Sequence, residues 1–88
     1  MTIVSTALNA SISEDLLELQ GMAGRAYKYM DGNPTSNPFF NAHYHRKMTI
    51  WIQNYEYAVR LIEEHDFSGP DNGLTTHIGS LRMSAGRA

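Results

Sequence analysis

The second half of the chain carries one apolar stripe that a helix would bring onto a single face. Its members recur at steps of four and three residues, and they are Tyr44, Met48, Trp51, Tyr55, Ala58 and Ile62. This spacing is typical of an amphipathic helix with one buried seam. Asn37 is a good N-cap residue, and Pro38 suits the first position of a helix. No helix continues through Gly69-Pro70, so we predict a helix over residues 38–65.

A second stripe of the same kind comes earlier in the chain. Its members are Ile12, Leu16, Leu19, Ala23, Ala26 and Met30. Ser11 and Glu14 have the spacing of a capping box, in which each side chain bonds the backbone N–H of the other residue. Gly32 is a natural left-handed residue for ending a helix. These signals predict a helix over residues 11–31.

Only residues 32–37 separate the two predicted helices, so we expect antiparallel neighbours in a helical hairpin. A strip of small residues lies within the first helix, formed by Gly21, Ala23, Gly24 and Ala26. We expect this strip to allow a close approach to Trp51 and Tyr55 of the facing helix. The alternative is that the two glycines are merely tolerated, at a cost of roughly 1 kcal/mol each relative to alanine.

The predicted fold class is all-α, with an N-terminal arm over residues 1–10, the hairpin over 11–66 and a less regular C-terminal tail over 67–88. In the tail, Thr76 is a candidate cap for a short helix that carries Ile78, Leu81 and Arg82. Its glycines weaken that helix, so the tail is expected either to dock on the hairpin or to become ordered on a partner.

Further apolar residues flank both stripes, namely Leu17, Met22, Ile52 and Val59. A hairpin of two helices cannot cover so wide an apolar surface, so we predict a homodimer with a helical-bundle arrangement. The residues expected in the core or dimer seam are Leu16, Leu19, Met48, Trp51, Tyr55 and Ile62.

Composition excludes several classes of protein. The 88 residues include no cysteine, so disulfides and thiolate zinc sites are excluded. No run of about 18 apolar residues is present, so we expect no membrane span and a cytoplasmic location, in a bacterium or a phage-infected host cell. His43 and His45 lie about 200° apart on a helix and cannot bind one metal ion together. No nucleophile, acid–base pair or phosphate loop is recognisable, so we predict a non-enzymatic protein without cofactor or metal.

Positive charge and aromatic rings are expected to gather at the loop of the hairpin. The predicted binding residues there are Arg25, Lys28, Phe39, Phe40, His43, Tyr44, Arg46 and Lys47. Cations interleaved with aromatic rings can neutralise phosphates and stack on bases. The net charge of −2 argues against generic nucleic-acid binding but allows such a local patch. Complementarity with the helix dipoles is the alternative explanation, although Arg46 and Lys47 oppose the dipole of their own helix.

Gly32, Asn37-Pro38-Phe39 and Trp51-x-x-x-Tyr55-x-x-Ala58 resemble the ribosome modulation factor family over residues 24–58. This resemblance implies a helical hairpin that binds the ribosome near its RNA and silences translation.

The second class of function is a small inhibitor or adaptor, such as a phage or mobile-element product that blocks a host enzyme or defence complex. Its acidic end or its aromatic loop would dock into a groove of the partner, the acidic residues being Glu14, Glu18, Glu63 and Glu64. The expected partner is therefore the ribosome or RNA in the first case and a single host protein in the second.

Overall fold

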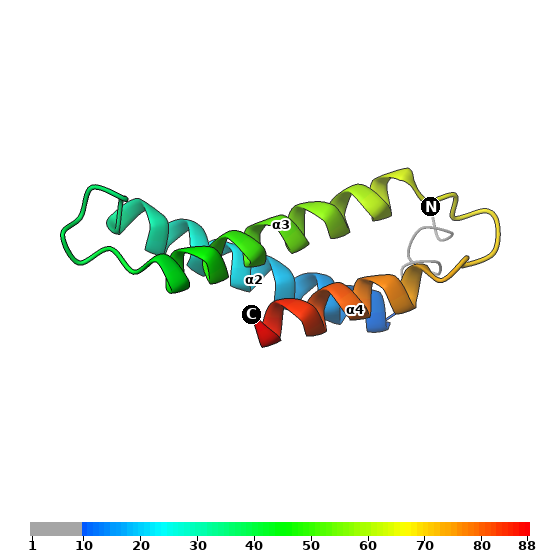
Figure 1. Ribbon diagram of the computed structural model, residues 1–88. Helices are drawn as coiled ribbons and strands as arrows, with labels where there is room; N and C mark the ends of the chain where they lie inside the picture. Colours follow the sequence, from blue (N-terminus) through cyan, green and yellow to red (C-terminus); the bar gives the residue numbers. More distant parts are fainter. Residues whose placement is uncertain (1–9) are drawn as a thin grey trace.

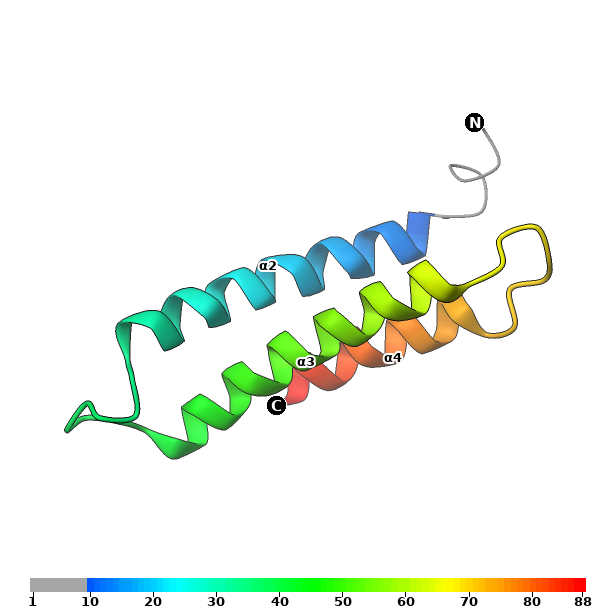
Figure 2. The same cartoon turned by 90° about the horizontal axis from the view of Figure 1, so that it is seen from above.

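The computed structural model describes residues 10–88, which form three α-helices and no strand (Figure 1). They are α2 (Ala10–Gly32), α3 (Ala42–Glu64) and α4 (Leu74–Arg87). α2 and α3 are antiparallel, whereas α4 runs parallel to α2, and every pair of helices is in contact (Figures 1 and 2). The predicted all-α class and the antiparallel hairpin are confirmed. The predicted arm lies outside the described residues, apart from Ala10.

The helices of the described chain are too short or too polar to cross a membrane.

The loop between α2 and α3 is longer than predicted, because α3 begins at Ala42 rather than at Pro38. Asn41 is the N-cap, and its side-chain oxygen accepts a hydrogen bond of 3.0 Å from the Tyr44 N–H. The predicted cap at Asn37 is wrong. Asn37 instead folds the loop, since its side-chain oxygen accepts from the Phe39 N–H at 2.9 Å and its carbonyl from the Phe40 N–H at 2.9 Å.

The two residues predicted to begin and end the first helix, Ser11 and Gly32, do not cap α2. Ser11 lies inside the helix and therefore does not cap it. Gly32 is still helical, and the positive φ angles among the described residues belong to Asn72 and Gly73. Asn33 ends α2 instead, because its side-chain amide donates to the Tyr29 carbonyl at 2.9 Å and its backbone N–H to the Met30 carbonyl at 3.3 Å.

The C-terminal tail is more regular than predicted. Asn72 and Gly73, with φ angles of 52° and 80°, turn the chain into α4. Asp71 supports this start by accepting from the Thr75 N–H at 3.1 Å, so the predicted cap at Thr76 is wrong. Of the two alternatives for the tail, docking on the hairpin is the one observed.

One core joins all three helices. Its fully buried large side chains are Ile12 and Leu19 of α2 and Ile78 of α4. The residues predicted to form the core or dimer seam pack within the single chain. Leu19 and Met48 are buried, and the others are partly buried against the core: Leu16, Trp51, Tyr55 and Ile62. α4 thus covers part of the apolar surface that a second subunit was expected to cover. Met22 is buried, but Leu17 remains 68% exposed.

In the predicted small-residue strip of α2, Ala23 and Ala26 are buried, whereas the glycines do not take part in close packing. Gly21 and Gly24 both face solvent. A β-carbon added to Gly24 would meet nothing within 4 Å, and one added to Gly21 would meet only the Arg25 guanidinium, at 3.6 Å.

We therefore expect Gly24→Ala to stabilise the protein by about 0.5–1 kcal/mol, because alanine has the higher helix propensity and nothing crowds it. Urea unfolding measures this as a higher midpoint. Ala26→Gly is the control and is expected to destabilise, since Ala26 is completely buried. Destabilisation by Gly24→Ala would show that this face of α2 is packed.

Candidate nucleic-acid interface

The hairpin extends well beyond α4 at the end that carries the α2–α3 loop. α4 ends near the middle of the molecule, so the hairpin alone forms the remainder (Figures 1 and 2). We call residues 25–51 the loop end. Four lysine and arginine residues and one aspartate lie in this stretch, which leaves a formal charge of +3 although the whole chain carries −2. Net positive charge is therefore concentrated at this end of the hairpin, most of which extends beyond α4.

Trp51 lies at the base of the loop end, where the three helices meet. Its indole N–H donates to the Ala85 carbonyl of α4 at 2.9 Å. The Arg25 guanidinium carbon lies 5.7 Å and the Lys47 Nζ 5.4 Å from the indole ring centroid. Both distances allow cation–π attraction, which positions a cation without cancelling its charge. Trp51 thus holds one cation from α2 and one from α3 at the same site.

Tyr44 continues this cluster toward the loop. Its ring centroid lies 5.5 Å from the Lys47 Nζ and 4.9 Å from the Tyr29 ring, with the two rings tilted by 54°. Tyr44 is nevertheless 45% exposed. The structure therefore brings three of the predicted binding residues together around Trp51 and Tyr29: Arg25, Tyr44 and Lys47.

The other predicted binding residues lie at the same end but outside this cluster. Lys28, His43 and Arg46 are exposed, and within residues 10–88 neither Lys28 nor Arg46 forms an ion pair. Phe40 packs against His45 with ring centroids 5.2 Å apart. Phe39 is 88% exposed at the tip of the loop. The loop end therefore presents cations without an ion pair in the described part of the chain, and one highly exposed aromatic ring.

Sequence reasoning placed Trp51 in the core and missed its contacts with the cations. The signal was present for Lys47, which lies four residues before Trp51 and so shares its helix face. The contact with Arg25 depends on the register between α2 and α3, which short-range spacing does not define.

A hydrogen bond across the hairpin borders the loop end. The Tyr27 hydroxyl donates to the Glu56 carboxylate at 3.0 Å. This hydrogen bond is the main cause of a raised pKa for Tyr27, with smaller contributions from partial burial and from the Glu56 charge.

At the opposite end of the molecule, the loop between α3 and α4 is held by contacts between residues close in sequence. Asp66 accepts hydrogen bonds from the Ser68 hydroxyl at 2.6 Å and from its N–H at 3.0 Å, and these bonds lower the pKa of Asp66. His65 packs on Phe67, with ring centroids 4.7 Å apart. Nowhere in residues 10–88 do three His, Asp or Glu side chains gather in a way that could hold a metal ion.

Comparisons of the chain with known protein families, with curated proteins and with solved structures found no match. The resemblance to ribosome modulation factor therefore stays a prediction.

We expect Trp51→Phe to destabilise the protein by about 1 kcal/mol, because the Ala85 carbonyl loses its indole donor. Urea unfolding measures the loss, and hydrogen exchange should become faster in the last turn of α4. Tyr57→Phe is the control, because it removes one exposed polar group from the same helix. It is expected to change neither the free energy of unfolding nor the hydrogen exchange of α4. Unchanged exchange in α4 would contradict the role assigned to Trp51.

Tyr27 gives a prediction for the dependence of stability on pH. Its pKa is raised in the folded state, so the stabilisation from its hydroxyl is present below the unfolded pKa of about 10 and is lost as pH rises through the folded value. The difference in free energy of unfolding between wild type and Tyr27→Phe should therefore be constant at neutral pH and shrink at alkaline pH. A difference that grows with pH would contradict the hydrogen bond to Glu56.

Proposed function

We propose that this protein is a non-enzymatic RNA-binding protein that acts through the loop end. The observation that carries the proposal is the unneutralised charge of +3 on residues 25–51, interleaved with aromatic rings, in a chain whose net charge is negative. Selection for solubility alone does not require such segregation. A nucleic-acid phosphate backbone binds such a surface favourably, because binding releases condensed counterions and so raises the affinity.

Each kind of side chain has a separate task in this proposal. Arg25 and Lys47, held at Trp51, neutralise neighbouring phosphates, and the freely exposed Lys28 and Arg46 widen the charged surface. Phe39 offers a ring face for stacking on an unpaired base, which contributes about 1–3 kcal/mol per base in single-strand binding proteins. The target class is therefore single-stranded or looped RNA.

The resemblance over residues 24–58 directs this proposal toward ribosomal RNA. We propose that the protein associates with ribosomes and lowers translation in the cytoplasm of a bacterium or a phage-infected cell. A homodimer remains part of the proposal, since it would present two loop ends to one ribosome and so raise the effective affinity.

Affinity for a labelled single-stranded RNA should fall steeply with salt. Contacts from four cations predict a slope of log K against log salt of roughly −3. Fluorescence anisotropy of the wild-type chain measures it. The double variant Arg46→Glu/Lys47→Glu should abolish binding, with circular dichroism confirming that its helices are intact.

Arg46→Glu and Arg60→Glu form the matched pair for this test. Both change an exposed arginine of α3 by the same charge, but Arg60 lies outside the loop end. Arg46→Glu should weaken RNA binding by about tenfold or more, and Arg60→Glu by much less. Equal effects would show that net charge alone governs binding, and unaltered binding by the double variant would overturn the proposed function.

A single host protein is the second candidate partner, and the exposure of Phe39 favours it. A phenylalanine ring 88% exposed at a loop tip could insert into an apolar pocket of an enzyme or defence complex. A pull-down from lysate, with and without nuclease, separates the two functions. Ribosomal subunits lost after nuclease indicate RNA binding, whereas one stoichiometric protein retained in both halves indicates an inhibitor or adaptor.

A further inference from the structure

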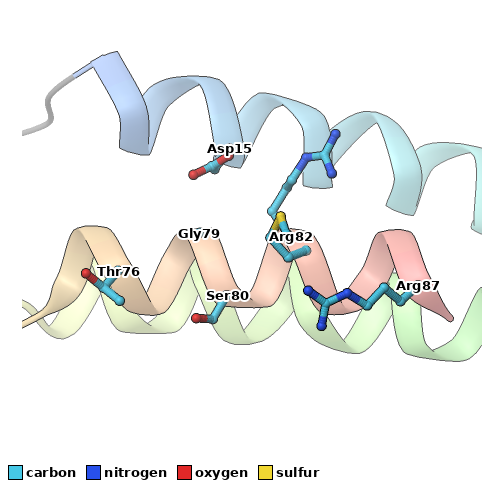
Figure 3. A pocket seen from close by; sticks show the side chains of 7 residues that line it. Asp15, Thr76, Gly79, Ser80, Arg82 and Arg87 are labelled. Carbon is cyan, nitrogen blue, oxygen red and sulfur yellow. The ribbon is translucent and has the colours of Figure 1, made fainter.

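The side of the molecule formed by α2 and α4 is hollowed along its length. Two shallow adjoining hollows of about 530 and 600 Å³ lie between these helices, and Asp15 and Arg82 line both. Figure 3 shows the side chains of the first hollow, with Arg82 extending from α4 toward α2. This side carries no residue of α3, so it is a surface distinct from the seam that closes the hairpin.

Charge is divided between the two helices that border the hollows. The α2 border is acidic over Glu14, Asp15 and Glu18 and ends in a single arginine, Arg25, whereas the α4 border contains Arg82 and Arg87. One exposed ion pair of 3.8 Å joins them, between the Arg82 guanidinium and the Glu18 carboxylate. The remaining charges of both signs are therefore available to a partner with the opposite arrangement.

Each helix also exposes one large apolar side chain on this face. Leu17 of α2 is 68% exposed and lines the second hollow, and Met83 of α4 is 51% exposed and lines the first. Neither side chain belongs to the core that joins the helices. α4 covers part of the apolar surface that was expected to bind a second subunit, and the α2–α4 face offers a dimer another apolar surface.

We propose that the α2–α4 face binds the same face of a second copy of this chain. α2 and α4 are parallel (Figures 1 and 2), so a two-fold axis along the bundle places α2 of one copy beside α4 of the other. The acidic border of each copy then faces the α4 arginines of the other copy, so the same charge contact occurs on both sides of the axis. Leu17 and Met83 of both copies are enclosed in the interface. Such a face is self-complementary, as a symmetric dimer requires.

This inference rests on the proposed dimer, and its surface shares one residue with the proposed RNA site, since Arg25 lines the second hollow. The interface is built on one side of two helices, so we expect reversible association rather than an obligate dimer. Sedimentation velocity over a concentration series of the full chain should show monomers and dimers, with Leu17→Glu/Met83→Glu monomeric throughout.

The control variant Ser36→Glu/Gln53→Glu adds the same charge at exposed positions away from the α2–α4 face and should still dimerise. A wild type that is monomeric at every concentration overturns both the dimer and this face. Dimers that persist in Leu17→Glu/Met83→Glu overturn only the face. Dimers lost equally in both double variants also overturn the face, because added charge would then be the cause.

A mixing experiment tests the charge arrangement directly. Arg82→Glu/Arg87→Glu makes both borders acidic, and Glu14→Arg/Glu18→Arg makes both basic. Each variant alone should be monomeric, whereas an equimolar mixture at physiological salt should form a one-to-one heterodimer by native mass spectrometry. Absence of the heterodimer, with both variants helical by circular dichroism, would overturn the proposed arrangement.

Discussion

The rest of the structure depends on the Trp51 indole, which is bound by all three helices. Its N–H holds the end of α4 through the Ala85 carbonyl, and its ring attracts Arg25 of α2 and Lys47 of α3. Four of the ten buried hydrophobic residues in the described part of the chain are alanines, so the core is small, and a polar bond from a half-buried aromatic residue contributes to tertiary order as well as to packing. The same ring positions two cations of the proposed RNA site, so that site and the packing of α4 share one residue.

Two further contacts show how side chains of the hairpin secure the third helix. Asn54 donates to the Leu81 carbonyl at 2.9 Å, one turn before the carbonyl bound by Trp51. Leu74, Ile78 and Ala85 place an apolar stripe of α4 against the hairpin. A segment with two glycines and several serine and threonine residues is a poor helix in isolation, so its order comes from this docking.

The sequence predicted both helices of the hairpin and most core residues, because steps of three and four residues are a strong signal. The ends were less predictable. Asn37 and Asn41 are both acceptable caps, and only the folded path of the loop selects Asn41. α4 was underestimated because local propensity outweighed the spacing of Leu74, Ile78 and Ala85. The location of the cations followed from the hairpin, but the contact of Arg25 with Trp51 required the register of the helices in three dimensions.

The limited length of α4 has a consequence for how the molecule opens. Where α4 lies on the hairpin, Ile12, Leu19, Ala58 and Ile78 form a core to which all three helices contribute, whereas at the loop end the buried apolar side chains are Ala26 and Met48. Less buried area means a lower free energy of local unfolding. The tip should therefore fray and re-form while the other half stays folded. The loop end could then adjust its conformation to a partner of irregular shape, while the three-helix half keeps its structure.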